Sequence, residues 1–354
     1  MKIALVSTPF VAVPPRDYGG TELVVYELAE GLVRRGHKVT VFATGDSRSS
    51  ARLEHLYPRA VWPPTGLADT NHVTWALSAI AREGDYDVVH VHSAMALATA
   101  RLLPPVPVVY TLHHPREESL SRFYEWFPDS WYVAISERQR ELEMPLPRIT
   151  TIYHGLNPRN YLGPTRAGDY VCFVGRLSEI KGPHIAIDVA ERAGVEIRVG
   201  GSIHGDDRDP DWPRRELEPR LRLPHVRYLG SVGLAEKVPL LLNARALLMP
   251  LYWEEPFGLI MLEAMLAGCP PVAFPRGSAP ELIEPGRTGF LVSGVEEMID
   301  VVRNRLDGFD REQCRARAAQ RFHRERMVAA YEAYYQQAMQ ETRTPSRLRT
   351  VASA

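Results

Sequence analysis

Short apolar runs alternate with stretches of helical periodicity along most of this chain. The first apolar run, residues 2–7, leads through a loop rich in Pro and Gly to a helical pattern over 23–35 and a second run over 38–43. A strand, a helix and a second strand in this order form a βαβ unit, which implies a parallel sheet. The later runs that we interpret as strands are 87–92, 107–115, 131–135, 149–157, 170–174, 196–199, 226–232, 246–252, 270–274 and 286–292.

The length of the chain, 354 residues, favours two domains rather than one. The Gly- and Pro-containing stretch 163–168 has the composition of an interdomain linker. We therefore expect one Rossmann-like domain over 1–163 and a second over 164–322. A helix over 323–341 is expected to pack back on the first domain, ahead of a polar tail, 342–354.

The composition of the chain argues against several classes of protein. A hydrophobic content of 45% and a net charge of −1 fit a globular protein without the basic surface that nucleic acids require. The sequence contains no run of about 18 apolar residues that would span a membrane. Cys172, Cys269 and Cys314 are too few and too scattered for a disulfide framework or a zinc site, so a cytoplasmic protein is expected.

The stretch 254–268, Glu-Glu-Pro-Phe-Gly-Leu-Ile-Met-Leu-Glu-Ala-Met-Leu-Ala-Gly, holds the most informative pattern. It follows an apolar run, and its Pro and Gly predict a strand-to-helix turn. The helix is expected to begin at Leu259 and end near Gly268, which places Glu255 in the turn and Glu263 on the helix. The first N–H groups of a helix lack intrahelical partners, so the turn is a candidate phosphate site flanked by two carboxylates.

Glu255 and Glu263, separated by seven residues that include Pro-Phe-Gly-Leu, resemble the signature of the family-4 retaining glycosyltransferases. The resemblance covers the whole chain and is most specific in the second half. It implies a GT-B fold, in which two doubly wound α/β domains face one another across a cleft. The nucleotide-sugar donor would then bind mainly to the second domain and the acceptor to the first. The alternative is an amphipathic helix with a solvated Glu face.

A cationic motif lies near the start of the second domain. The apolar run 170–174 is followed by Arg176 and, five residues later, by Lys181 at the start of an expected helix. Two cations at the carboxyl end of a strand suit a diphosphate, whose negative charge grows as the sugar bond breaks. The spacing resembles the family's Gly-Arg…Lys-Gly motif. Two ordinary surface cations are the alternative.

The first domain offers a glycine loop and a histidine. The loop lacks the G-x-G-x-x-G pattern of dinucleotide-binding proteins. Instead it ends in Gly19 and Gly20, which resemble the family loop that covers the donor phosphate; a plain helix N-cap at Thr21 is the alternative. His113 follows an apolar run and resembles the family histidine that faces the sugar.

Further positions are interpreted by the same resemblance or by local pattern. His90 and His92 are expected to pack within the sheet. The family usually has Asn where this chain has His154, so the contact made by that Asn is in question. In the family the segment after the strand 226–232 lies against the nucleotide base, and Tyr228 is an expected donor contact.

Two stretches allow two interpretations each. The aromatic stretch 123–132 is expected to pack in the core, with an acceptor-binding wall as the alternative. Membrane contact there is not supported, because neighbouring acidic residues would be repelled by anionic lipid. The acidic run 205–211 is expected to be a solvated loop rather than a metal site.

The resemblance predicts transfer of a hexose from a UDP- or GDP-linked donor to a hydroxyl of a secondary metabolite, lipid or glycan, with retained anomeric configuration. No metal and no cofactor are expected. His113 and Glu255 are the expected catalytic residues. The expected donor-binding residues are Gly19, Gly20, Arg176, Lys181, Tyr228, Glu255, Phe257, Gly258, Leu259 and Glu263.

Other functions on such a chain remain open at this point. A sugar-nucleotide epimerase or a phosphorylase could use the same fold, although the four lysines offer poor candidates for a pyridoxal Schiff base. A non-catalytic sugar-nucleotide-binding module would bind the donor without turnover. An NAD oxidoreductase is disfavoured by the missing dinucleotide fingerprint.

Overall fold

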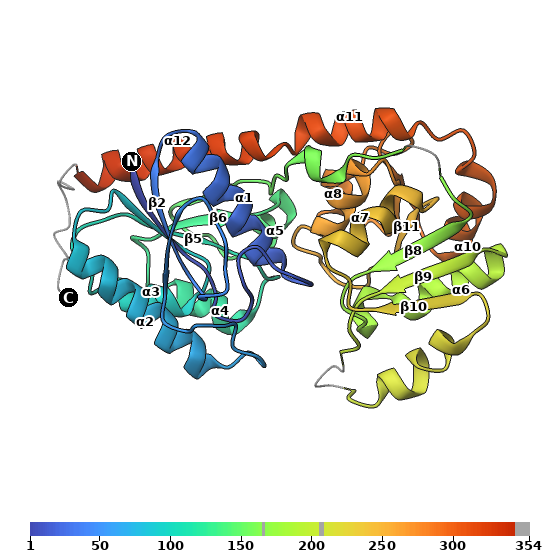
Figure 1. Ribbon diagram of the computed structural model, residues 1–354, viewed down its shortest axis with the longest axis horizontal. Coiled ribbons are helices and arrows are strands. Elements are labelled where there is room, and N and C mark those ends of the chain that lie inside the picture. Colours follow the sequence, from blue (N-terminus) through green and yellow to red (C-terminus); the bar gives the residue numbers. More distant parts are fainter. Residues whose placement is uncertain (165–166, 205–208, 344–354) are drawn as a thin grey trace.

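The computed structural model describes residues 1–164, 167–204 and 209–343. In this part of the chain two parallel β-sheets form separate lobes (Figure 1). The strand order is β3-β2-β1-β4-β5-β6-β7 in the first lobe and β10-β9-β8-β11-β12-β13 in the second. Helices pack against both sheets, which confirms the predicted α/β fold of two Rossmann-like domains.

Each predicted apolar run overlaps a strand, because strands buried on both faces read as continuous hydrophobic segments, although several strands are shorter than their runs. Strand β3 was not predicted, because its residues are exposed or only partly buried and form no apolar run. The strands of the first lobe are β1 Lys2–Val6, β2 Lys38–Ala43, β3 Arg52–His55, β4 Val88–Val91, β5 Val108–Thr111, β6 Trp131–Ala134 and β7 Ile149–Thr151. The strands of the second are β8 Tyr170–Val174, β9 Glu196–Gly200, β10 Val226–Gly230, β11 Leu247–Met249, β12 Pro271–Ala273 and β13 Phe290–Leu291. They lie on either side of the expected linker 163–168, of which 165–166 lie outside the described residues.

The helices cover the sheets and connect most of the successive strands. The helices of the first lobe are α1 Gly20–Arg34, α2 Gly66–Glu83, α3 Met95–Ala100, α4 Glu118–Tyr124 and α5 Glu137–Leu142. Those of the second are α6 Pro183–Ala193, α7 Leu234–Asn243, α8 Leu259–Leu266, α9 Ala279–Leu282, α10 Val295–Asp300 and α11 Arg311–Arg321. The last helix, α12 Arg324–Arg343, follows α11 directly.

Helix α1 begins earlier than its apolar pattern predicts. The pattern starts at Leu23, whereas the helix starts at Gly20 with Gly19 as its N-cap. The difference arises because Glu22, a polar residue that the pattern excludes, is buried and accepts a hydrogen bond from the Thr8 hydroxyl. The alternative of an N-cap at Thr21 is therefore wrong, and the paired glycines form the start of the helix.

Helix α12 crosses from the second lobe to the first and runs along α1 (Figure 1). Its buried residues Val328, Tyr331 and Tyr335 join the apolar core formed by β1, β2 and α1. Hydroxyl groups on the helix also reach the sheet, since Tyr334 donates to the carbonyl oxygens of Tyr132 and Arg148. The helix therefore ties the end of the chain to the first lobe.

The close approach of α1 and α12 leads to a stability prediction. A Cβ atom added at Gly31 would lie 2.3 Å from Val328 Cγ2, so a side chain there overpacks the helix interface. We expect Gly31→Ala to lower the free energy of unfolding by about 1–3 kcal/mol in urea denaturation. Gly66→Ala, on α2 with open space around its Cβ position, is the matched control and should not destabilise. Equal stability of the two variants would contradict the packing argument.

Candidate functional site

Several of the predicted site residues follow strands that flank the switch points of the two sheets. In the first sheet the order changes direction between β1 and β4, and in the second between β8 and β11. Ligands of open parallel sheets bind beyond the carboxyl ends of strands at such points. Arg176 and Lys181 follow β8, and Glu255 follows β11, so these three residues flank the switch point of the second sheet.

Lys181 and Glu255 form a buried ion pair. The Lys181 ammonium group contacts Glu255 Oε2 directly, and both side chains are about one-tenth exposed. The indole Nε1 of Trp253 donates to the same carboxylate oxygen at 3.1 Å, and the ammonium lies 4.3 Å from the centre of that ring. Burial lowers the pKa of Lys181 and the charge of Arg176 lowers it further, whereas Glu255 opposes the shift. The two residues, predicted from separate motifs, therefore belong to one cluster.

Arg176 adds a second cation beside this pair. Its Nε atom is buried and has no hydrogen-bond partner among the described residues. Its charge acts on the Lys181 ammonium and also on the Tyr18 hydroxyl, which comes from the loop after β1. The site thus holds one guanidinium without a carboxylate partner in the described part of the chain, next to one ammonium that has such a partner. A free guanidinium donor is suited to bind a phosphate oxygen.

Helix α8 carries Glu263, which is 2% exposed. Its carboxylate contacts the ammonium group of Lys237 on α7 at 2.6 Å and accepts a hydrogen bond from the Tyr161 hydroxyl at 3.0 Å. Neither Lys237 nor Tyr161 stands in a sequence motif that pointed to the site. The scarcity of lysine in this chain was the signal that could have drawn attention to Lys237, but only the fold shows its partner.

The residues between the two glutamates have different environments. Gly258 has φ of +74°, and a Cβ there would lie 2.4 Å from Met261 Cε, so this turn requires glycine. The side chain of Phe257 is 2% exposed and packs against His154 and Phe322 in the core. Only the backbone of Phe257 can therefore face a ligand, and its carbonyl oxygen already accepts a hydrogen bond from Ser278.

The glycines of the first lobe reach the second lobe. A Cβ added to Gly20 would contact Leu259 Cδ1 at 3.4 Å, so the start of α1 lies against the start of α8. Gly19 is enclosed by its own loop, because a Cβ there would lie 2.8 Å from Pro15 Cβ. Gly20 and Leu259, predicted from different domains, are neighbours across the boundary between the lobes.

His113 lies at the carboxyl end of β5 among other histidines. Its Nε2 is 2.8 Å from Nδ1 of His92, and its ring stacks on that of His154 with centroids 5.6 Å apart. His154, where the family usually has Asn, is 4.8 Å from the ring of Phe257 in the second lobe. The interpretation of His92 as a packing residue was incomplete, because His92 hydrogen-bonds the predicted catalytic histidine. His90 is buried and hydrogen-bonded to Tyr335 and Thr111.

Tyr228 lies on β10 and is 40% exposed. Its hydroxyl donates to the carbonyl oxygen of Gly201 at 3.0 Å. Gly201 in turn packs so closely against the backbone of Gly175 that a Cβ would lie 1.8 Å from the Gly175 oxygen. Tyr228 therefore contacts Gly201, which in turn contacts Gly175, the residue before Arg176. The role of Tyr228 towards a nucleotide base stays a prediction.

A second contact between the lobes lies beside Glu255. The Glu281 carboxylate of α9 accepts hydrogen bonds from the backbone N–H groups of Glu137 and Arg138 at the start of α5. The Arg138 side chain donates to Glu254 at 2.9 Å. A carboxylate at a helix N-terminus is electrostatically favourable. This contact fixes α5 of the first lobe against the turn that carries Glu255.

The aromatic stretch 123–132 is mainly a packing element. Tyr124, Phe127 and Trp131 are buried, whereas Trp126 is 70% exposed. Part of the acidic run, 205–208, lies outside the described residues. In the described part, Asp209 pairs with Arg215 at 2.7 Å. Within the described residues, no group of three or more His, Cys, Asp or Glu side chains could hold a metal ion.

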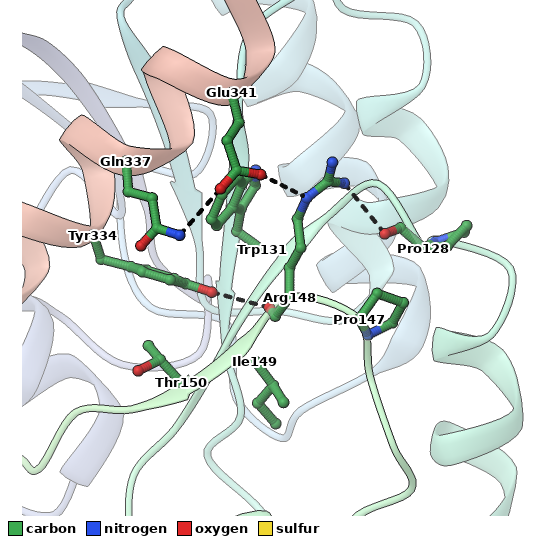
Figure 2. Close-up of a pocket in the computed structure, with 9 residues that line it drawn as sticks. All are labelled: Pro128, Trp131, Pro147, Arg148, Ile149, Thr150, Tyr334, Gln337 and Glu341. Atoms are coloured by element: carbon green, nitrogen blue, oxygen red, sulfur yellow. Dashed lines mark hydrogen bonds and ion pairs between the residues drawn. The ribbon is translucent and has the colours of Figure 1, made fainter. Parts of the chain in front are cut away.

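A hollow of about 500 Å³ is lined by residues of α12, β6 and β7 and of the loops beside these strands. Figure 2 shows the side chains around it. Its charged groups are paired, since Arg148 contacts Glu341 at 3.5 Å. The lining contains no predicted site residue and consists of Pro128, Trp131, Pro147, Arg148, Ile149, Thr150, Tyr334, Gln337 and Glu341. Across the described ranges, none of the helices combines the length and the apolar character needed to cross a membrane.

Comparison with protein families gives two matches that together span most of the chain. Residues 18–160 match the model described as Glycosyltransferase Family 4. Residues 168–307 match the model described as Glycosyl transferases group 1. An uncharacterized glycosyltransferase of Methanocaldococcus jannaschii is 27% identical over 334 residues, which cover 80% of this chain and 83% of that protein.

Solved structures share the fold over nearly the whole chain. AviGT4, a glycosyltransferase involved in avilamycin A biosynthesis, has a TM-score of 0.77 at 23% identity, covering 96% of this chain and 98% of that one. The Anabaena protein Alr3699/HepE, solved in complex with UDP and glucose, has a TM-score of 0.72 at 20% identity, covering 95% and 100%. At these identities the likeness establishes the architecture.

Proposed function

We propose, from the premise that this chain belongs to the family-4 glycosyltransferases, that it is a retaining hexosyltransferase. Its donor is a UDP- or GDP-linked hexose, and its acceptor is a hydroxyl group of a small molecule, lipid or glycan. Glycosyltransferase activity follows from the family. Donor, acceptor and retention are our proposal, supported by the arrangement of charges at the switch point of the second sheet.

The reaction exchanges one bond at the anomeric carbon for another. The bond between that carbon and the diphosphate oxygen breaks, and a bond to the acceptor oxygen forms on the same face. The acceptor proton passes to the departing phosphate oxygen, so the reaction needs no separate protein base. The departing diphosphate gains negative charge as the bond breaks, and fixed positive groups aimed at it stabilise that charge most in the transition state.

Each site residue has a proposed role in that step. Arg176 and Lys181 bind the diphosphate, with the start of α8 supplying backbone N–H groups. Glu255 and the backbone of Phe257, Gly258 and Leu259 hold the sugar. The remaining assignments come from the family resemblance: Glu263 for the ribose, Tyr228 for the side of the base, Gly19 and Gly20 for the phosphate, and His113 for the sugar near the reacting carbon.

We propose that the reaction uses neither a metal nor a cofactor, since Arg176 and Lys181 can supply the positive charge that a divalent cation often supplies. We also propose a cytoplasmic location. Cys172, Cys269 and Cys314 are buried free thiols, which suits a reducing compartment.

One observation carries the proposal: a guanidinium and an ammonium lie together at the switch point of the second sheet, beside Glu255 and a helix N-terminus. Incubating the protein with a panel of UDP- and GDP-hexoses and candidate acceptors tests it. We expect release of nucleoside diphosphate that requires the acceptor, and a product whose anomeric configuration, read by NMR, matches the donor. Donor binding without release under every condition would indicate a binding module instead.

Arg176 provides a direct test of the diphosphate assignment. We expect Arg176→Ala to lower kcat/KM by roughly 100-fold, because one of two cations facing the departing charge is lost while Lys181 remains. Arg214→Ala is the matched control, since Arg214 is an exposed arginine of the same lobe, and it should retain full activity. Full turnover of Arg176→Ala would contradict the assignment.

A further inference from the structure

His92 and His113 come from adjacent strands and meet behind the proposed sugar site. They follow β4 and β5, and the Nδ1 atom of His92 lies 2.8 Å from Nε2 of His113. At this distance one of the two nitrogens carries a proton and donates it to the other. The orientation of this single hydrogen bond therefore decides which nitrogen of His113 is protonated.

Both rings are neutral in the folded protein near neutral pH. Burial lowers the pKa of His92 well below its usual value, and neighbouring His90 and His154 lower it further. Burial, followed by the neighbouring histidines, does the same to the pKa of His113. Each neutral imidazole carries one proton, so only two arrangements of the pair remain.

The far side of His92 distinguishes these arrangements. Its Nε2 is buried and has no hydrogen-bond partner in the described part of the chain. If His113 donated to His92, this Nε2 would have to carry a buried N–H group without an acceptor. If His92 donates, Nε2 holds only an unused lone pair. A buried N–H without an acceptor is the rarer and more costly defect, so the second arrangement is favoured.

We propose that His92 is a positioning residue that donates its Nδ1 proton to His113 and thereby holds His113 as the tautomer with its proton on Nδ1. The Nδ1 of His113 has no hydrogen-bond partner within the described residues, so this arrangement leaves an N–H group for a ligand. Building on the proposed function, that group donates to an oxygen of the transferred sugar. His92 acts only through His113.

The surroundings hold His92 in the donating position. Its ring centre lies 4.2 Å from that of His90, and the His90 nitrogens are hydrogen-bonded to the hydroxyls of Tyr335 and Thr111. On the other side, the ring of His154 stacks on His113 at an interplanar angle of 22°. The crossing helix α12, through Tyr335, therefore supports the row of histidines from behind.

The tautomer can be read directly in the ligand-free protein. Nitrogen-15 NMR of protein labelled at histidine distinguishes a protonated from an unprotonated ring nitrogen. We expect His113 to show a protonated Nδ1 and an unprotonated Nε2, with the hydrogen bond to His92 visible as a coupling to that Nε2. A protonated Nε2 on His113 would overturn the proposal. Because no donor or acceptor is present, this result does not depend on the transferase assignment.

Three substitutions of His92 test the consequence for catalysis. The amide nitrogen of Asn occupies the position of Nδ1, whereas that of Gln reaches the position of Nε2, and Leu supplies neither. We expect His92→Leu and His92→Gln to lower kcat by roughly 10- to 100-fold and His92→Asn to recover most of the loss, with the KM for the donor changed less than kcat. Equal activity of the Asn and Leu variants, both folded by circular dichroism, would overturn the proposal.

His72→Leu serves as the control for removing a buried histidine. His72 is fully buried on α2, and burial lowers its pKa to about 4, so it is a neutral buried histidine like His92. The variant should leave the nitrogen shifts of His113 unchanged. A shift of the His113 tautomer in this variant would show that general repacking, rather than the contact with His92, sets the protonation of His113, and would overturn the proposal.

Discussion

Replacing Lys181 with methionine is expected to lower kcat by about 100- to 1000-fold, which is the scale of losing one preorganised donor to a developing negative charge. The ammonium group is buried against Glu255 and Trp253, close to Arg176, so water cannot substitute for it easily. Methionine keeps the length and apolar stem of the side chain. Steady-state kinetics with the best donor and acceptor pair would measure the effect.

A double-substitution cycle separates the lost charge from damage to the fold. Removing Lys181 alone leaves the Glu255 carboxylate buried without its cation, which costs stability. The double variant Lys181→Met with Glu255→Gln removes both charges, so its melting temperature should recover towards the parent value while kcat stays low. Recovery of activity in the double variant would show that Lys181 acts on Glu255 rather than on the departing diphosphate.

The fold was largely predictable because most of its strands are short, apolar and buried on both faces, whereas the polar strand β3 was missed. Runs such as 38–43 and 88–91 therefore stand out in the sequence regardless of their partners. The order of the strands in the sheets was not readable from the runs themselves, and the family resemblance implied only that the two domains are doubly wound. The start of α1 was missed because Glu22 is a polar residue that is nevertheless buried. Its burial depends on the hydrogen bond from Thr8, which the local pattern does not reveal.

The site was predictable to the extent that local motifs determine it. Arg176, Lys181 and Glu255 each stand in a strand-to-helix turn with recognisable neighbours, and the structure brings all three together. Contacts between distant segments were not predictable. Tyr161 and Glu263 are 102 residues apart and His92 and His113 are 21 apart, so only the packing of the sheets reveals these pairs.

Separation along the chain also explains why the charged pair between α1 and α12 had no signature in the sequence. Arg324 and Glu27 are 297 residues apart, yet their side chains are 4% and 0% exposed and meet at 2.8 Å. Replacing Arg324 with methionine is expected to lower the free energy of unfolding by about 3–5 kcal/mol, because a buried carboxylate then loses its cation. Chemical denaturation monitored by circular dichroism would measure this loss.

The dependence of that loss on pH gives the prediction a second, independent test. Burial already raises the pKa of Glu27 in the presence of Arg324, which opposes the shift, so removing Arg324 should raise it further. A carboxyl group with a higher pKa in the folded than in the unfolded chain favours folding as the pH falls. The destabilisation should therefore be larger at about pH 8 than at about pH 5.

Arg34→Met is the matched control, because Arg34 is 58% exposed and pairs with Glu325 on the same helix interface. This variant should lower the free energy of unfolding by no more than about 1 kcal/mol at either pH. A loss in Arg324→Met that did not vary with pH would show that Glu27 carries no charge in the folded protein and that the helix is held by apolar packing alone.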